Sequence, residues 1–169
     1  MLNLDLALLG DWLNAYLWVL FRVASMLMTM PVFGTQLLPM RVRLYLALLL
    51  SLLITPQIPA VPSLDMLSLA SWLLIGEQIL IGACMGFMLQ LLFQVHVIAG
   101  QIIAMQMGLG FASMNDPAMG ISVAVVSQVF TMLTTLLFLG MNGHLVAIEV
   151  LAESFTSLPI GQFFQLSTW

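Results

Sequence analysis

The chain reads Gly108-Leu-Gly-Phe-Ala-Ser-Met-Asn-Asp-Pro-Ala-Met-Gly120 between two long apolar segments. This stretch combines three glycines with an Asn-Asp-Pro turn, and neither flank has the composition of a soluble linker. In hydrocarbon, a break in a helix leaves backbone N–H and C=O groups without partners, which is tolerated only where protein or a water-filled cavity surrounds the break. The stretch therefore predicts a non-helical loop that is buried in an assembly or lines a passage.

The composition of the whole chain is that of a membrane protein. Its 169 residues are 62% hydrophobic and 6% charged, whereas a soluble domain is about 45–50% apolar and roughly 25% charged. Three basic and seven acidic residues do not make a soluble surface. We therefore predict an all-α, membrane-associated protein in contact with lipid. The net charge of -4 is small and scattered, which argues against nucleic acid as a partner.

Three helical segments precede the loop. We expect a first helix from Trp12 to Met30, close to the roughly 20 residues that span a bilayer, and a shorter second helix from Leu44 to Ile54. A third helix continues from Met66 to about Met107 without a proline. At about 1.5 Å per residue it would be on the order of 60 Å long, about twice the hydrocarbon core. It must therefore kink, tilt strongly, project beyond the bilayer or be two helices.

Two helical segments follow the loop. Asp116 and Pro117 have the residue types preferred at the N-cap and first position of a helix, so we expect a fourth helix from there to Met141. Asn142 and Gly143 suit a helix C-cap. A fifth helix is predicted from about His144 to Leu158, so the chain has four or five helices and no separate soluble domain.

The sequence shows no motif for catalysis or for a metal. His96 and His144 stand far apart, with no histidine, cysteine or acid at metal-ligand spacing. Glu77 and Asp116 offer the alternative of a membrane aspartyl pair, but a lone polar group and a helix cap explain them more simply. Cys84 lies in an apolar run and is interpreted as a small buried hydrophobe. We predict no enzyme, no catalytic residue, no metal site and no cofactor.

Polar and small residues recur along the predicted third helix. Gln90, Gln94 and Gln101 are four and seven residues apart, which places them on one face of a helix. Such a face indicates either hydrogen bonds between helices or a wetted channel wall, and both interpretations stay open. Gly82 and Gly86 form a small-x-x-x-small pattern that permits close approach of another helix.

Arg22 interrupts the first apolar segment near its middle. An arginine at the centre of a membrane helix costs at least about 2.5–3.5 kcal/mol on insertion scales. We therefore expect Arg22 to find an acid or a cluster of carbonyl groups, unless the segment does not lie in the middle of a bilayer.

Methionines gather around the central loop: Met105, Met107, Met114 and Met119. Flexible thioether side chains fill gaps of irregular shape. The cluster is consistent either with a gasket that seals a changing gap or with ordinary packing.

Several segments in this order resemble the FliR/SctT family of type III secretion export-gate proteins. The resemblance covers nearly the whole chain and favours the flagellar branch of the family. The segments that carry it are Pro31-Val-Phe-Gly34, Pro39, Arg41-Val-Arg43, Gly110-Phe-Ala-Ser-Met-Asn-Asp-Pro117, Gln128, Leu136-Leu-Phe-Leu-Gly-Met-Asn-Gly-His-Leu145 and Ser154-Phe-Thr-Ser-Leu-Pro-Ile-Gly161.

The resemblance implies a subunit of an export gate in the inner membrane, at the flagellar basal body. Such subunits assemble with FliP-like and FliQ-like gate subunits into a helical, roughly conical complex, next to FlhB-like and FlhA-like export proteins. The complex conducts unfolded flagellar substrates, and its helices form bent hairpins that do not simply span the bilayer. The alternatives are a homologue from a virulence-type secretion system (injectisome), or an unrelated small channel or transporter with Arg22, Glu77 and His96 along an ion path.

The resemblance also implies roles for particular residues. Family members continue past Leu-Pro-Ile-Gly into a FliQ-like hairpin, whereas this chain stops at Trp169, so residues 1–169 are interpreted as one domain that corresponds to the FliP-like part. The loop from Gly108 to about Ser122 is expected to plug the closed pore. The plug residues are Gly108, Gly110, Phe111, Ala112, Ser113, Met114, Asn115, Asp116, Pro117, Met119 and Gly120, and the expected contacts with the pore or other subunits are Arg22, Glu77, Gln90, Gln94, Gln101, Met105 and Met107.

Overall fold

The computed structural model describes residues 6–34, 38–58, 69–107, 113–115 and 122–161. Within these residues the chain is mainly helical, with connecting turns and one short hairpin, which confirms the predicted all-α class. The elements are α1 (Leu6–Thr29), α2 (Met40–Ile54), the 3₁₀ turn η1 (Thr55–Gln57), α3 (Leu69–Gln106), β1 (Ser113–Asn115), β2 (Ser122–Ala124), α4 (Val125–Gly140) and α5 (Gly143–Ser157).

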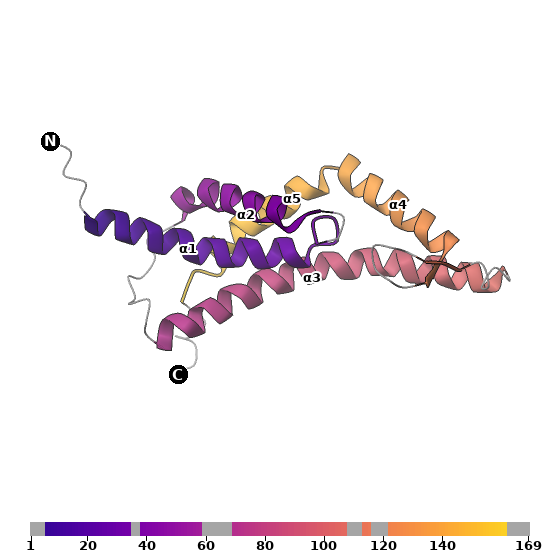
Figure 1. Cartoon of the computed structure of the whole chain (residues 1–169), viewed down its shortest axis with the longest axis horizontal. Helices are drawn as coiled ribbons and strands as arrows, with labels where there is room; N and C mark the ends of the chain where they lie inside the picture. Colours follow the sequence, from indigo (N-terminus) through magenta and orange to yellow (C-terminus); the bar gives the residue numbers. More distant parts are fainter. Residues whose placement is uncertain (1–5, 35–37, 59–68, 108–112, 116–121, 162–169) are drawn as a thin grey trace.

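Helix α3 extends along most of the length of the molecule (Figure 1). Helix α1 packs along the first part of α3 and α4 packs back along its last part, while α2 packs on α1. Helix α5 shares a buried core with α1 and α2, and the part of the molecule around α1 is thicker than the end formed by α3, α4 and the hairpin (Figure 1).

Two glycines of α3 bring α1 within backbone contact. A Cβ atom on Gly82 would meet the Ser25 hydroxyl and the Arg22 carbonyl oxygen, and one on Gly86 would lie 2.7 Å from the carbonyl oxygen of Met26. The small-x-x-x-small pattern therefore permits close helix approach, as predicted. Gly82 meets Arg22 and Gly86 meets Met26. The contacts thus advance in the same direction along both helices, so α1 and α3 run parallel.

The apolar core lies around α1 and is built from four helices. Helix α1 supplies most of it, and α2, α3 and α5 each add side chains that are almost fully buried. Its largest members are Trp18, Met26, Leu27, Met30, Ile54, Leu74, Leu151 and Phe155.

Large apolar side chains also lie exposed along the outside of the chain, as expected of a protein covered by lipid or by other subunits. Two segments are long and apolar enough to cross a membrane, Met40–Gln57 and Ser71–Gln106. The pair α4 and α5 passes the same test together, with a bend of 64° between them. Length and composition thus allow two or three spans in the described part of the chain.

The predicted helices are present, with corrections at their ends. Helix α1 begins at Leu6, and α2 begins at Met40, so that its first turn contains Arg41 and Arg43. Among the alternatives for the third segment, α3 is one continuous helix of 38 residues. The predicted side-chain burial of Cys84 is wrong: this side chain is exposed.

The prediction that Asp116 and Pro117 start the fourth helix is wrong. Helix α4 begins at Val125, directly after β2. The residues before it pair with β1 instead of continuing the helix toward its N-terminus, so backbone pairing outweighs the local capping preference.

The joint between α4 and α5 lies where the sequence predicted a helix end. Asn142 has left-handed backbone angles, φ 57° and ψ 27°, a conformation that asparagine and glycine adopt most readily. A Cβ atom on Gly143 would lie 2.5 Å from the ring of Phe138. The joint is therefore a tightly packed corner, and α5 over Gly143–Ser157 confirms the fifth predicted helix.

Candidate functional site

The central loop forms a short antiparallel hairpin at the end of α3. Strands β1 and β2 pair Ser113 with Ala124, Met114 with Val123 and Asn115 with Ser122. Strand β2 contacts both α3 and α4. The loop is therefore non-helical in its described part, as predicted, and the strand pairing gives partners to backbone groups that the break in the helix would leave unpaired.

Three of the expected plug residues, Ser113, Met114 and Asn115, form β1. The others lie outside the described residues: Gly108, Gly110, Phe111, Ala112, Asp116, Pro117, Met119 and Gly120.

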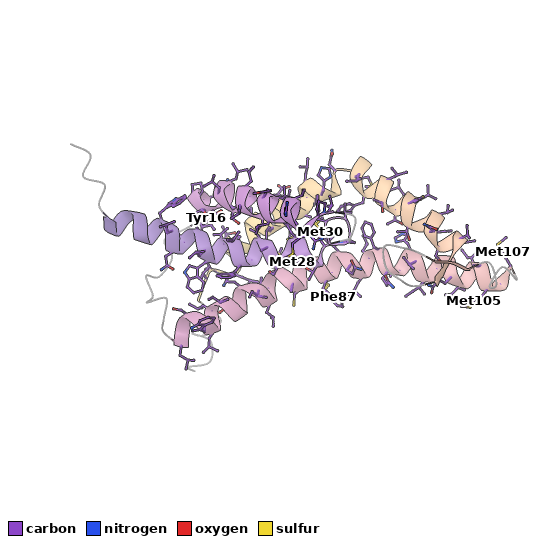
Figure 2. The ribbon with its side chains drawn as sticks, viewed as in Figure 1. Tyr16, Met28, Met30, Phe87, Met105 and Met107 are labelled. Carbon is purple, nitrogen blue, oxygen red and sulfur yellow. The ribbon has the colours of Figure 1, made fainter. Side chains whose placement is uncertain are left out.

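Two methionines stand at the end of α3 that adjoins the hairpin. Met105 is 71% exposed and Met107 is 65% exposed. In Figure 2, Phe87 and Met105 project from the side of α3 that faces away from α1 and α4, and Met107 lies at the far end of the molecule. These thioethers are thus available to another subunit, to lipid or to a passage, and they contribute little to the core of this chain.

The three glutamines lie on α3 as predicted. Gln94 is exposed, and Gln90 and Gln101 are half-buried. Within the described residues, none of the three has a hydrogen bond to another residue. The glutamine face thus makes no hydrogen bond between the described helices, and its role as a contact or a wetted wall stays a prediction.

Arg22 is fully buried and joins three helices. Its Nε donates a hydrogen bond of 2.8 Å to Oε1 of Gln78 in α3. One terminal nitrogen donates to the carbonyl oxygen and the hydroxyl of Ser154, at 3.0 and 3.1 Å. The other donates to the carbonyl oxygen of Leu158 at 3.0 Å. Arg22 thus finds the predicted carbonyl cluster, and its place is inside the chain.

The carbonyl groups that Arg22 binds are at the C-terminal end of α5. The C-terminal end of a helix carries a partial negative charge, which a cation stabilises. The Ser154 carbonyl oxygen also accepts the backbone N–H of Leu158 at 2.9 Å, so Arg22 adds a second donor to it. The guanidinium carbon also lies 4.2 Å from the centre of the Phe155 ring, within the range of a cation–π interaction. Arg22 therefore acts as a cap for α5 that is supplied from α1.

Sequence reasoning missed Gln78 and selected its neighbour Glu77. Gln78 is fully buried, whereas Glu77 is half-buried. Neither carboxylate oxygen of Glu77 has a hydrogen-bond partner among the described residues. The signal that would have found Gln78 is its spacing of four residues from Gly82, which places both on the side of α3 that faces α1.

The histidines do not form a metal site in the described structure. Within the residues that the structure describes, no three histidine, cysteine, aspartate or glutamate side chains lie close enough together to hold a metal ion. Nδ1 of His96 lies 3.0 Å from the carbonyl oxygen of Leu92, one turn earlier in α3. His96 therefore uses this nitrogen within its own helix.

Comparison with known proteins matches the chain to one family. Residues 13–169 match the bacterial export proteins, family 1. The flagellar biosynthetic protein FliR of Escherichia coli (strain K12) is 43% identical over 153 residues, which cover 89% of this chain and 58% of that protein. FliR of Pectobacterium carotovorum is 40% identical over 151 residues, covering 89% and 57%. FliR of Aquifex aeolicus is 38% identical over 154 residues, covering 90% and 59%. The chain thus spans less than two thirds of the length of these relatives.

Proposed function

The chain belongs to the FliR family of bacterial export proteins, family 1, and we propose that it is a subunit of the flagellar type III protein export gate. In this proposal it forms a pore for unfolded flagellar proteins together with FliP-like and FliQ-like subunits, next to FlhB-like and FlhA-like proteins. The gate lies in the bacterial inner membrane, residues 1–169 act as one domain, and the chain carries out no catalysis.

The observation that carries the proposal is the hairpin between α3 and α4. Two apolar helices converge on a short stretch of extended backbone that pairs with itself. Backbone of this kind is tolerated at membrane depth only where protein or a water-filled cavity surrounds it. We propose that the segment from Gly108 to about Ser122 closes the pore, with β1 and β2 as its base.

The glutamine face and the two methionines fit the same assignment. Gln90, Gln94 and Gln101 have no hydrogen bonds inside the described chain, and Met105 and Met107 are largely exposed. We propose that these residues meet the pore or a neighbouring subunit, and that the thioethers adapt their shape when the plug moves.

The ion-path alternative has less support. It needs Arg22, Glu77 and His96 along one path, but Arg22 is enclosed by its hydrogen bonds to α3 and α5. His96 lies nineteen positions after Glu77 in the same helix, which corresponds to about 28 Å at 1.5 Å per residue.

The plug is tested by ion conductance of the assembled complex in a planar bilayer. Deletion of residues 116–121 should raise the leak through the closed gate, since the chain that blocks the pore becomes shorter. Deletion of six residues from the connector at 59–68 is the matched control and should leave the conductance unchanged. Equal conductance of the wild type and of the variant that lacks residues 116–121 would contradict the proposed role as a plug.

The subunit role is tested by native mass spectrometry after co-expression with FliP and FliQ. We expect a hetero-oligomer that contains a single copy of this chain. A stable assembly of this chain alone would favour the transporter alternative.

A further inference from the structure

An apolar groove of about 810 Å³ lies between α3, α4 and α5. Its walls include Met85, Met88 and Leu92 from α3, Leu137 and Phe138 from α4, and Val146 from α5. The tight corner at Asn142 and Gly143 sets its width, because α4 and α5 diverge by 64° there while both line the groove. It is thus a fixed feature of the fold, distinct from the hairpin and from the Arg22 cluster.

The groove offers few groups to a polar or charged occupant. None of the described residues that line it is an acid, a lysine or an arginine. Oγ1 of Thr134 donates to the carbonyl oxygen of Phe130 at 2.8 Å, and Nδ1 of His96 lies 3.0 Å from the carbonyl oxygen of Leu92. The two polar side chains in the wall therefore use these atoms within their own helices. Water needs about two to four polar partners to occupy a cavity, so the matching occupant is neutral and apolar.

The size of the groove fits a chain-like ligand better than a protein partner. Its volume lies within the range of about 300–1,000 Å³ typical of small-ligand pockets. Sixteen residues line it, whereas a protein interface of standard size uses about 20–30 residues a side. An α-helix about 10 Å across would fill this volume with roughly two turns.

We propose that this groove binds one acyl chain of a membrane phospholipid. It lies in two stretches that are long and apolar enough to cross a bilayer, Ser71–Gln106 and the bent pair α4 and α5, and a bilayer around these stretches would bring lipid tails to the groove. The thioethers of Met85 and Met88 line the groove, and unbranched, flexible methionine side chains adapt to a hydrocarbon chain that has no fixed shape. The bound lipid would support the corner between α4 and α5 from inside.

The test measures phospholipid that remains bound to the full chain. The chain is reconstituted in vesicles of phosphatidylethanolamine and phosphatidylglycerol, extracted into mild detergent and weighed by native mass spectrometry. We expect one retained phospholipid per chain. Val146→Trp fills the groove from a side chain that is 53% exposed, and Val129→Trp is a control on α4 that is 50% exposed and does not line the groove. Retention should fall by roughly tenfold in the first variant, since displacing a few buried CH₂ groups is enough for that change, and stay within about twofold in the control.

A second pair of variants guards against a folding defect, and labelling locates the lipid. Leu137→Trp should behave like Val146→Trp, and Met132→Trp like the control; these two side chains are 63% and 61% exposed. A phospholipid with a diazirine in mid-chain should label Met88 and Val146 after detergent extraction. The proposal is overturned if the chain retains no phospholipid, or if the retained mass is that of a free fatty acid. It is also overturned if the labels lie outside the groove, or if a groove variant and its control lose phospholipid equally. None of these outcomes bears on the role in protein export.

Discussion

Nε of Arg22 in α1 donates a hydrogen bond of 2.8 Å to Oε1 of Gln78 in α3, and both side chains are fully buried. The same guanidinium holds two carbonyl oxygens at the end of α5. Three helices that are far apart in the sequence are thus held in register by one side chain with fixed hydrogen-bond geometry. Apolar packing alone tolerates small shifts between helices, whereas the hydrogen bonds of Arg22 would lengthen or break if one of the three helices shifted.

Replacement of Arg22 with methionine should destabilise the fold by about 1–3 kcal/mol, because buried neutral acceptors such as Oε1 of Gln78 are left without a donor. The free energy of unfolding in detergent, followed by far-UV circular dichroism, measures this loss. Arg41→Met is the matched control: Arg41 is exposed in the first turn of α2, and surface changes usually stay within about 0.5 kcal/mol. Equal stability of the two variants would contradict the role given to Arg22.

Gly82→Ala should separate α1 from α3. The added Cβ meets the Arg22 carbonyl oxygen and the Ser25 hydroxyl, and overpacking of this kind typically costs about 1–3 kcal/mol. Gly76→Ala serves as the control in the same helix, since a Cβ there meets nothing within 4 Å. This control should be neutral or stabilising by up to about 1 kcal/mol, because alanine is the better helix former. The same unfolding measurement compares the two, and a control as unstable as Gly82→Ala would show that the close approach is not the cause.

Asn142 should tolerate glycine better than alanine. Its φ of 57° lies in the left-handed region, where most residues with a Cβ pay roughly 1–2 kcal/mol, asparagine pays less, and glycine pays almost nothing. We expect Asn142→Ala to lose part of this stability and Asn142→Gly to keep the wild-type bend. Distances between spin labels on α4 and α5, measured by double electron–electron resonance, report the bend. If both variants keep the same distances and stability, the left-handed backbone does not set the corner.

The hairpin register can be tested with pairs of cysteines in a Cys84→Ser background. Residues directly opposite in an antiparallel pair have Cα atoms about 4.5–5.5 Å apart, within the range of about 4.4–6.8 Å for disulfides. Ser113→Cys with Ala124→Cys, which are opposite each other, should therefore cross-link under mild oxidation.

The control pairs Ser113→Cys with Ser122→Cys, which are diagonal in the same register and about 7–8 Å apart. It should cross-link poorly. A faster reaction in the diagonal pair would show that the register is shifted. If the hairpin moves with the plug, the first cross-link should also reduce export of flagellar substrates, and a reducing agent should restore it.

The number of helices and most of their ends could be predicted from the sequence because apolar runs alternate with prolines and glycines. The start of α4 could not. Asp116 and Pro117 satisfy every local preference for a helix start, but β2 pairs with β1 across the loop. That pairing depends on where α3 and α4 place the two ends of the loop, and a local sequence pattern carries no information about this placement.

The sequence indicated the kind of group that Arg22 binds, but not which residues supply those groups. The cost of burying Arg22 indicated an acid or a cluster of carbonyl groups, yet the two carbonyl groups that it binds are 132 and 136 residues away. The choice between Glu77 and Gln78 needed the orientation of α3. One residue is a rotation of about 100° around a helix, and α3 is apolar on nearly all sides, so its apolar periodicity does not show which side meets α1. The spacing of Gln78 from Gly82 marks that side, but only once Gly82 is known to meet α1.

The length of α3 decides how much of its apolar surface a bilayer can cover. Its 38 residues measure about 57 Å, and at a tilt of about 40°, the upper end of the usual range, the helix still rises about 44 Å. A hydrocarbon core of about 30 Å leaves part of it uncovered, although Leu69 and Met105 near its two ends are 78% and 71% exposed. A bilayer alone therefore cannot cover all of the apolar surface of α3, and the remainder needs protein or another apolar contact to keep it from water.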